Sequence, residues 1–284
     1  MKTKFTDNDS FKVISYDIQE GFWQDKEAEM FSEDWKLLKK IENKGLIISN
    51  HKEINFVDFN GNNIWESSIK CSGIPNDAKV SSDRLIVTTN SEDYHAWGYL
   101  GLATLIDLNK GKIIKELKGA RAQSLDNGSF LLGLEGYDIF NTWLYDSNGV
   151  LLKEWKSYGQ YLIINKEIFV IEDDRRGNTS AHIVKLCLNG KIKKGKKLKS
   201  SSSSNPLLLD DEVFIFENFG ELSIINNNLI EIAKFKLLSY DKEQSWRFFS
   251  RISKEKDLFE ISILERTEEL PLEYKTHNWK VKID

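Results

Sequence analysis

The sequence predicts an all-β fold in which a unit of four strands recurs along the chain. Three observations carry this prediction. A tight turn rich in Asn and Gly recurs at intervals of roughly 40 residues. A second short hairpin precedes each of these turns, and the chain ends one strand short of a complete unit while beginning with an unaccompanied strand.

The recurring turn is clearest in LYDSNGVLLKEW (144–155), where Asn148-Gly149 separates two segments of apolar and β-prone residues. Asn and Gly suit this place because tight hairpin turns need positive φ, which other residues adopt only with strain. Four more segments have the same arrangement of strand, turn and strand: 54–69, 103–117, 182–198 and 222–235.

The preceding hairpins consist of a strand, a few turn residues and a strand of β-branched and aromatic residues. They lie at 36–50, 78–90, 120–134, 160–172 and 206–217. Each joins the turn segment that follows it, giving five units of four strands. Units of about 40 residues with four strands are typical of β-propeller blades.

The two ends of the chain complete a sixth unit. A hairpin at 246–266 and a strand at 274–283 leave one strand missing, and FKVISYDI (11–18) is a lone strand that can supply it. Such closure removes exposed sheet edges. We therefore predict one domain, 1–284, folded as a six-bladed β-propeller whose ring is closed by the N-terminal strand. The predicted blades are 35–70, 77–118, 120–157, 158–200, 205–238 and 246–283 with 11–18.

VDFNGNNIW and YDSNGVLLKEW share an Asp, a turn Gly and a Trp at similar spacing. In this they resemble the quinoprotein-like repeats (PQQ-like or WD40-like) of β-propellers. The fourth and fifth units depart from the pattern, because they lack both Asp and Trp. Proteins with such repeats include redox enzymes, assembly scaffolds and binding proteins, so the resemblance implies a fold rather than a function.

Composition narrows the classes of function. The net charge is −4 and the pI about 5.8, so the whole-chain charge does not favour a nucleic-acid partner. The N-terminal residues lack the apolar run of a secretory signal, and no apolar stretch is long enough to cross a bilayer. Two cysteines, Cys71 and Cys187, are too few for a disulfide framework. We expect a cytoplasmic protein that is monomeric on its own.

The predicted blades have two different ends. At one end lie the turns between first and second strands and between third and fourth strands, and these are short. At the other end lie the connections between second and third strands and the links between blades. These are longer and varied, as in 90–101, 135–141, 172–181 and 266–273. Variable loops on a rigid scaffold are where binding residues concentrate. Aromatic residues and Arg dominate the energetic centres of protein interfaces. The predicted partner-binding residues at the long-loop end are Tyr94, His95, Trp97, Tyr99, Tyr137, Phe140, Asp173, Asp174, Arg175, Arg176, Tyr240 and Trp246.

Catalytic and metal-binding motifs are not found in the sequence. The four histidines show no HxH, HxxxH or HExxH spacing, and no nucleophile-elbow, P-loop or GxGxxG pattern occurs. We therefore expect neither a cofactor nor a metal. An alternative reading is a hydrolase or lyase acting on a glycan or small ester at the mouth of the channel. Asp173, Asp174 and His95 are then the acid and base candidates.

Two further segments have competing interpretations. KIKKGKKLKSSSSSNP (191–206) is typical of a lysine-protected edge strand followed by a flexible link, and less so of a contact with an anion or RNA. QDKEAEMFSEDW (24–35) is the one helix-like stretch and leads from the closing strand to the first blade.

These observations favour a non-catalytic protein that binds another protein through its long-loop end. Within this class, a bacterial toxin-neutralising (immunity) protein fits a small, acidic, free-standing propeller. A scaffold in a larger assembly differs from it mainly in the number of partners.

Overall fold

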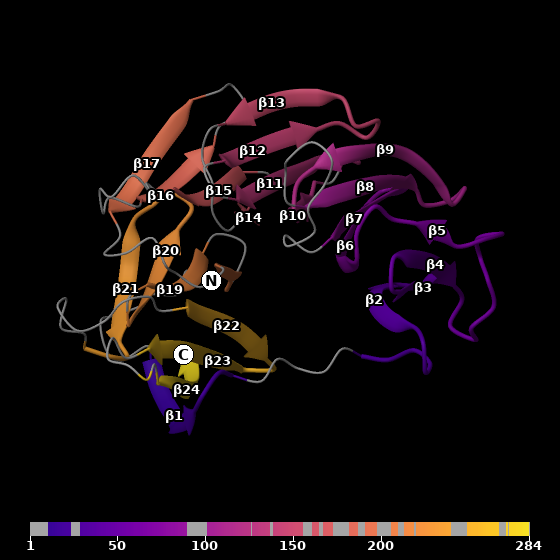
Figure 1. Cartoon of the computed structure of the whole chain (residues 1–284). Helices are drawn as coiled ribbons and strands as arrows, with labels where there is room; N and C mark the ends of the chain where they lie inside the picture. The colour runs from indigo at the N-terminus through magenta and orange to yellow at the C-terminus, as the bar shows by residue number, and fades with distance from the viewer. Residues whose placement is uncertain are drawn as a thin grey trace. The chain divides into compact units, whose positions relative to one another are not determined.

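The computed structural model contains six four-stranded antiparallel sheets, and no helix occurs among the residues that it describes (Figure 1). Those residues are 11–23, 29–89, 101–125, 127–136, 139–155, 161–164, 167–172, 182–186, 191–197, 206–209, 213–218, 220–239, 249–266, 271 and 273–283. The chain divides into two compact units, 26–159 and 160–284 with 1–25. We describe each unit by itself.

The unit of residues 26–159 holds three blades, each with its strands in chain order. Blade 1 consists of β2 (Lys36–Ile41), β3 (Gly45–Asn50), β4 (Glu53–Val57) and β5 (Ile69–Lys70). Blade 2 consists of β6 (Pro75–Ser81), β7 (Arg84–Thr89), β8 (Leu102–Asp107) and β9 (Lys112–Lys118). Blade 3 consists of β10 (Arg121–Ser124), β11 (Phe130–Gly136), β12 (Ile139–Tyr145) and β13 (Leu151–Trp155).

The other unit also holds three blades. Blade 4 consists of β14 (Tyr161–Ile164), β15 (Glu167–Glu172), β16 (His182–Leu186) and β17 (Ile192–Lys197). Blade 5 consists of β18 (Leu207–Leu208), β19 (Val213–Asn218), β20 (Glu221–Asn226) and β21 (Glu231–Lys236). Blade 6 consists of β22 (Phe249–Glu255), β23 (Leu258–Arg266), β24 (Tyr274–Ile283) and β1 (Phe11–Glu20).

The N-terminal strand completes the last blade, as the sequence predicts. β1 runs antiparallel to β24 from the pair Phe11–Ile283 to the pair Glu20–Lys275, with one bulge at Ile14. It lies at the outer edge of the sheet, beside β24 (Figure 1). The pairing covers the edge of β24 over the whole length of that strand. Closure of the six blades into one ring, and the single domain that it implies, stay predictions.

The turn between the third and fourth strands is built in the same way in four blades. The side-chain oxygen of Asp58, Asp107, Asp146 or Asn226 accepts two backbone N–H groups of the turn that follows it. In blade 3, Asp146 Oδ1 accepts from the backbone N of Asn148 and of Val150, both at 2.8 Å. Asn226 does the same in blade 5, at 3.0 and 3.1 Å, so an amide oxygen replaces the carboxylate where the repeat lacks Asp.

Neighbouring blades of one unit are joined through these turns. The buried indole of Trp65, on blade 1, donates its Nε1–H to the carbonyl of Leu108 in the turn of blade 2 at 2.8 Å. Gly111 of that turn, at φ +61°, lies so close that an added Cβ would come within 2.6 Å of the indole. Lys115 of blade 2 in turn donates to the carbonyl of Gly149, in the turn of blade 3, at 3.0 Å.

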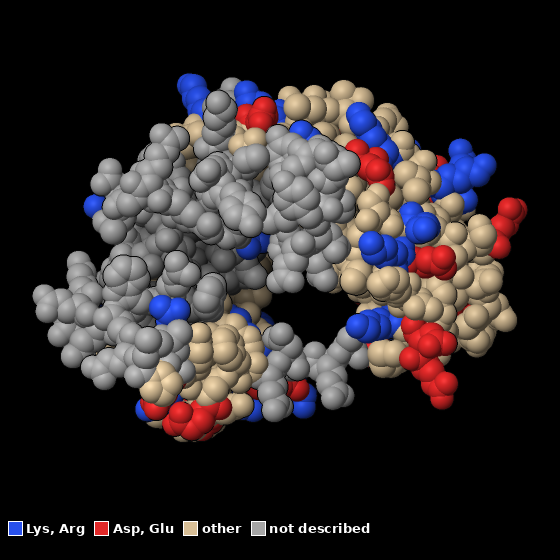
Figure 2. All heavy atoms as spheres, viewed as in Figure 1, with Lys and Arg blue, Asp and Glu red and all other residues tan. Residues whose placement is uncertain are grey.

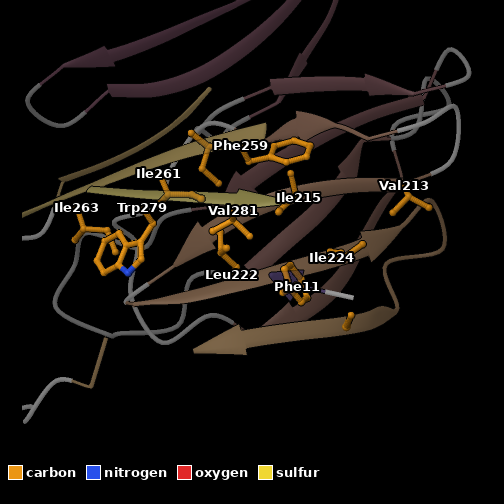
Figure 3. Packing of buried hydrophobic residues seen from close by; sticks show 12 residues of the cluster. Phe11, Val213, Ile215, Leu222, Ile224, Phe259, Ile261, Ile263, Trp279 and Val281 are labelled. Carbon is orange, nitrogen blue, oxygen red and sulfur yellow. The ribbon is translucent and has the colours of Figure 1, made fainter. Parts of the chain in front are cut away.

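The apolar core between blades 5 and 6 includes residues from both ends of the chain. Phe11 of β1 is buried with Val281 and Trp279 of β24, and packs its ring on Phe235 of β21 with centroids 5.4 Å apart. Figure 3 shows Phe11, Trp279 and Val281 together with buried side chains of β19, β20 and β23. Burial of the first residue of β1 in this core, together with the hydrogen bonds to β24, fixes the N-terminal strand.

Two sequence predictions require correction. The expected helix at 24–35 is absent from its described part, 29–35, where Met30 bridges to Lys36 and the backbone N–H groups of Phe31 and Ser32 both donate to the carbonyl of Trp35. The segment folds back on β2 because Met30 and Phe31 are exposed and give a helix no apolar face to bury. The expected loop at 135–141 is mostly strand, since β11 and β12 pair as far as Gly136 and Ile139.

Candidate functional site

The two ends of the blades differ in the connections that they carry. At one end, the described turns are short and closed by the repeated Asp or Asn side chains. At the other end, the connections between second and third strands are two residues long in blades 1, 3 and 5. They are much longer in blades 2, 4 and 6, where they cover 90–101, 173–181 and 267–273. Long loops therefore alternate with tight turns from blade to blade along the chain, and the loop expected at 135–141 of blade 3 is one of the tight connections.

The predicted partner-binding residues fall almost entirely outside the described residues. Of the twelve, only Phe140 lies on a described backbone, in β12 opposite Glu135 of β11, and its side chain is outside the description. The structure thus shows that Phe140 belongs to a strand end rather than to a long loop. The grouping of the other eleven residues stays a prediction.

A buried carboxyl group lies at the long-loop end of blade 5. Glu217, near the end of β19, is 1% exposed, and its Oε1 accepts the backbone N–H of Gly220 at 2.6 Å. Burial raises the pKa of Glu217 to about 7, against the opposing effect of hydrogen bonds from Ser250 and Gly220. Since Ser250 belongs to β22, this carboxyl group connects blade 5 to the first strand of blade 6.

The carbonyl of Gly220 extends this connection to the link between the two blades. It accepts the backbone N–H groups of Leu237 and Leu238, at 2.8 and 3.1 Å. The link therefore starts from a fixed position beside Glu217. Tyr240 and Trp246, two of the predicted binding residues, lie further along this same link, outside the described residues.

Three polar side chains form a hydrogen-bonded chain on blade 6. Tyr16 Oη lies 2.9 Å from Nδ1 of His277, and Nε2 of His277 lies 2.8 Å from Oε2 of Glu265. The ring of Tyr16 also stacks on Trp279, with centroids 5.0 Å apart. His277 and Trp279 are buried whereas Tyr16 is 46% exposed. Partial burial, followed by the charges of Glu265 and Asp17, raises the pKa of Tyr16, so the phenol stays protonated.

Aromatic side chains continue from this chain to the long-loop end of blade 6. Just past β1, Phe22 is 57% exposed and packs on Tyr274, with ring centroids 4.4 Å apart. Next to it, the guanidinium of Arg251 lies over the ring of Trp23 at 5.0 Å. Exposed aromatic rings and a stacked Arg are the residue types enriched at the centres of protein interfaces. We call Tyr16, Phe22 and Trp23, together with the exposed Ile18, the blade 6 aromatic edge, because they lie on or just after the outer strand β1.

The chemical state of Glu217 and of Tyr16 follows from their surroundings. The side chain of Glu217 is almost completely shielded from solvent. Tyr16 is not activated as a nucleophile, because the pKa of its phenol is raised rather than lowered. Within the described ranges, no group of three or more His, Cys, Asp or Glu side chains could hold a metal ion. Nor is any described helix long and apolar enough to cross a membrane.

Glu217, His277, Tyr16 and Glu265 were not among the residues predicted from the sequence. For Glu217 the sequence did carry a signal, namely an acidic residue directly after the apolar run VFIF, whose residues are all buried in β19. The chain from Tyr16 to His277 joins residues 261 positions apart, and it follows only from the register of β1 against β24.

No known protein family and no curated protein sequence matches the chain. Among solved structures it is similar to Kluyveromyces lactis Hsv2, at 10% sequence identity and a TM-score of 0.56, with 86% of each chain covered. It is also similar to a protein of unknown function from Dyadobacter fermentans, at 10% identity and a TM-score of 0.47, with 97% of this chain and 100% of that chain covered. Hsv2 is a β-propeller, and likeness at this identity shows the fold alone. The chain therefore has the β-propeller fold that its repeats predict.

Proposed function

We propose that the chain is a non-catalytic protein-binding propeller that holds its partner at the long-loop end of its blades. The observation that carries the proposal is the difference between the two blade ends. One end consists of tight turns whose polar groups are satisfied within the turn or by the preceding blade, as at the carbonyls of Leu108 and Gly149. The other carries the long connections of blades 2, 4 and 6, which contain Trp97, Arg175 and Arg176.

The blade 6 aromatic edge supports the proposal from described side chains. Phe22 and Trp23 follow β1 at the end where the connection 267–273 also leaves blade 6. The exposed ring of Phe22 and the half-buried ring of Trp23 extend the predicted surface with contact area that is stiff and apolar. A partner seated on the long loops of blade 6 would therefore bury Phe22.

Within this class we propose a toxin-neutralising role in a bacterial cytoplasm. The net charge of −4 complements a basic toxin and would speed association with it. The motif shared with quinoprotein-like repeats does not argue against this role, because that resemblance implies only a fold.

The test compares two triple variants in pull-downs from native lysate, with bound proteins identified by mass spectrometry. The first variant replaces Trp97, Arg175 and Arg176 with Ala at the long-loop end. The second replaces Phe59, Lys44 and Lys110 with Ala at the short-turn end, so that it also removes one aromatic ring and two cations. We expect the first to lose a stoichiometric partner and the second to retain it, with melting temperatures equal to that of the wild type.

Two outcomes would overturn the proposal. Equal retention by both variants would place the contact elsewhere, and background alone for the wild type would favour the enzymatic alternative, with Asp173, Asp174 and His95 as acid and base candidates. The neutralising role has a separate test. The captured partner, expressed alone, should arrest growth, and co-expression of the wild-type chain but not of the long-loop variant should restore it.

A further inference from the structure

Blade 4 contains a long stretch of the chain without any acidic residue. From Arg175 to Leu209 there are nine Lys and Arg residues and no Asp or Glu, although the whole chain has a net charge of −4. On the face shown in Figure 2, in contrast, Lys and Arg lie among Asp and Glu over the described residues. A local block of one sign is a feature that the whole-chain charge conceals.

The structure places the lysine-rich part of this stretch on a sheet edge. β17 is the outermost strand of blade 4 and pairs only with β16. Lys193 and Lys197 are exposed, and neither forms a salt bridge with any described carboxylate. The described carboxylate of Glu167 is instead engaged by Lys185 of β16. Among the described side chains, no carboxylate therefore neutralises Lys193 or Lys197, which leaves these two charges available to an external anion.

The register of the sheet adds a like-charge pair. Lys185 of β16 lies directly opposite Lys193 of β17, and of the two only Lys185 has a described carboxylate, that of Glu167, to offset its charge. Lys193 Nζ reaches 3.4 Å from the carbonyl of Asn228, in the turn of blade 5. Next to that turn, β21 adds two exposed lysines, Lys234 and Lys236, together with the acid Glu231, whose carboxylate accepts from Ser223.

We propose that the outer edge of blade 4 binds the phosphate backbone of a nucleic acid, independently of base sequence. Lysine occupies four of the six positions of β17, which gives on the order of one charge per 5 Å of strand, against about one phosphate per 3.4 Å along one strand of B-DNA. These positions lie on both faces of the strand, so a phosphate backbone that follows the outer edge of blade 4 meets lysines from either side of that edge. No aromatic residue lies within β17, so bases are not read by stacking.

Two other classes of partner fit these observations less well. An acidic peptide is better held by Arg, whose fork binds carboxylates through two bonds, whereas Lys acts as a point charge and is a common ligand of phosphate. An anionic membrane is planar and takes up apolar side chains, and Ile192 is the one large apolar residue of β17. This surface is an outer strand, not the long-loop end, so the inference goes beyond the proposed function.

The test measures binding of a fluorescent single-stranded oligonucleotide by anisotropy as NaCl is raised from about 50 to 200 mM. Lys193→Gln/Lys197→Gln is compared with Lys112→Gln/Lys115→Gln on β9, which is the outer strand of blade 2. The control is matched because it removes the same charge, and because Lys115 also bonds to the turn of the following blade. Melting temperatures confirm that both variants fold.

We expect the wild type to bind with a steep dependence on salt, and the β17 variant to bind more weakly. Its slope of log K against log [NaCl] should be shallower by about 1.4, as the loss of two phosphate contacts on a single strand predicts. The β9 control should keep the slope of the wild type. The proposal is wrong if the wild type does not bind at the lowest salt, if both variants lose affinity equally, or if only polyglutamate or anionic vesicles bind. None of these results bears on the pull-down with the long-loop variants.

Discussion

The buried carboxyl group of Glu217 should make the free energy of unfolding depend on pH over a defined range. The carboxyl group is 1% exposed, and burial raises its pKa to about 7 from an ordinary value of 4.5. A raised pKa means that the folded protein holds the proton more tightly than the unfolded chain. The contribution of Glu217 to stability is therefore fully present below pH 4.5 and is lost as the pH rises through about 7.

The size of the effect follows from the two pKa values. Ionising the buried group costs the folded state roughly 3 kcal/mol once the pH is above the higher value, because each tenfold change in proton affinity corresponds to about 1.4 kcal/mol. Glu217→Gln removes the charge but keeps an oxygen that can accept from Gly220 N. The variant should match the wild type at acid pH. Between about pH 5 and pH 8 its advantage should grow by roughly 2 to 3 kcal/mol.

Urea unfolding followed by tryptophan fluorescence, at several pH values in the same buffer series, measures the difference directly. Subtracting wild type from variant cancels the other titrating groups. Glu255→Gln is the matched control, because Glu255 is an exposed carboxylate at the end of β22 in the same unit. A difference between Glu217→Gln and wild type that stays constant with pH would refute the reasoning, as would a variant that becomes less stable relative to wild type as the pH rises.

Three further predictions concern the blades. In urea unfolding, Gly111→Ala should destabilise the protein by about 1 to 3 kcal/mol more than Gly61→Ala. Both glycines have positive φ, but only a Cβ at residue 111 would meet the indole of Trp65. Asp146→Ala should lower the stability by about 1 to 2 kcal/mol in the same assay, because two turn N–H groups lose their acceptor. Asp146→Asn should be nearly neutral, because the amide oxygen of Asn226 accepts the same two bonds in blade 5. Tyr16→Phe should lower the stability by about 1 kcal/mol through loss of the bond to His277, and an unchanged unfolding midpoint would contradict that bond.

The strand pattern of this protein was predictable because each repeat depends on residues that are neighbours in the sequence. Gly149 has a φ of +72°, which glycine adopts without strain, and the residues on either side of the turn are apolar and β-prone. Each hairpin is therefore visible in its own residues. The pairing of β1 with β24 was also predictable, from the count of strands. A missing strand at one end and a spare strand at the other leave one simple solution.

What the sequence did not show depends on contacts between distant residues. The hydrogen-bonded chain of Tyr16, His277 and Glu265 exists because β1, β24 and β23 are neighbours in one register, and no local pattern encodes that. The helix-like pattern at 24–35 was misleading in its described part, 29–35, where Met30 and Phe31 are exposed and Met30 bridges to Lys36. The alternation of long loops and tight turns between blades could not be seen in the sequence, because EGYDIFN (135–141) has the composition of a loop. In the structure the two ends of this segment extend β11 and β12.

The most direct test of the account is hydrogen exchange of the chain with and without the partner that the pull-down captures. We predict protection on binding in the connections 90–101, 173–181 and 267–273 and around Phe22. No change is expected in the turns that follow Asp58, Asp107 and Asp146. Protection confined to those turns, or to the outer strands alone, would contradict the claim that the long-loop end is the binding surface.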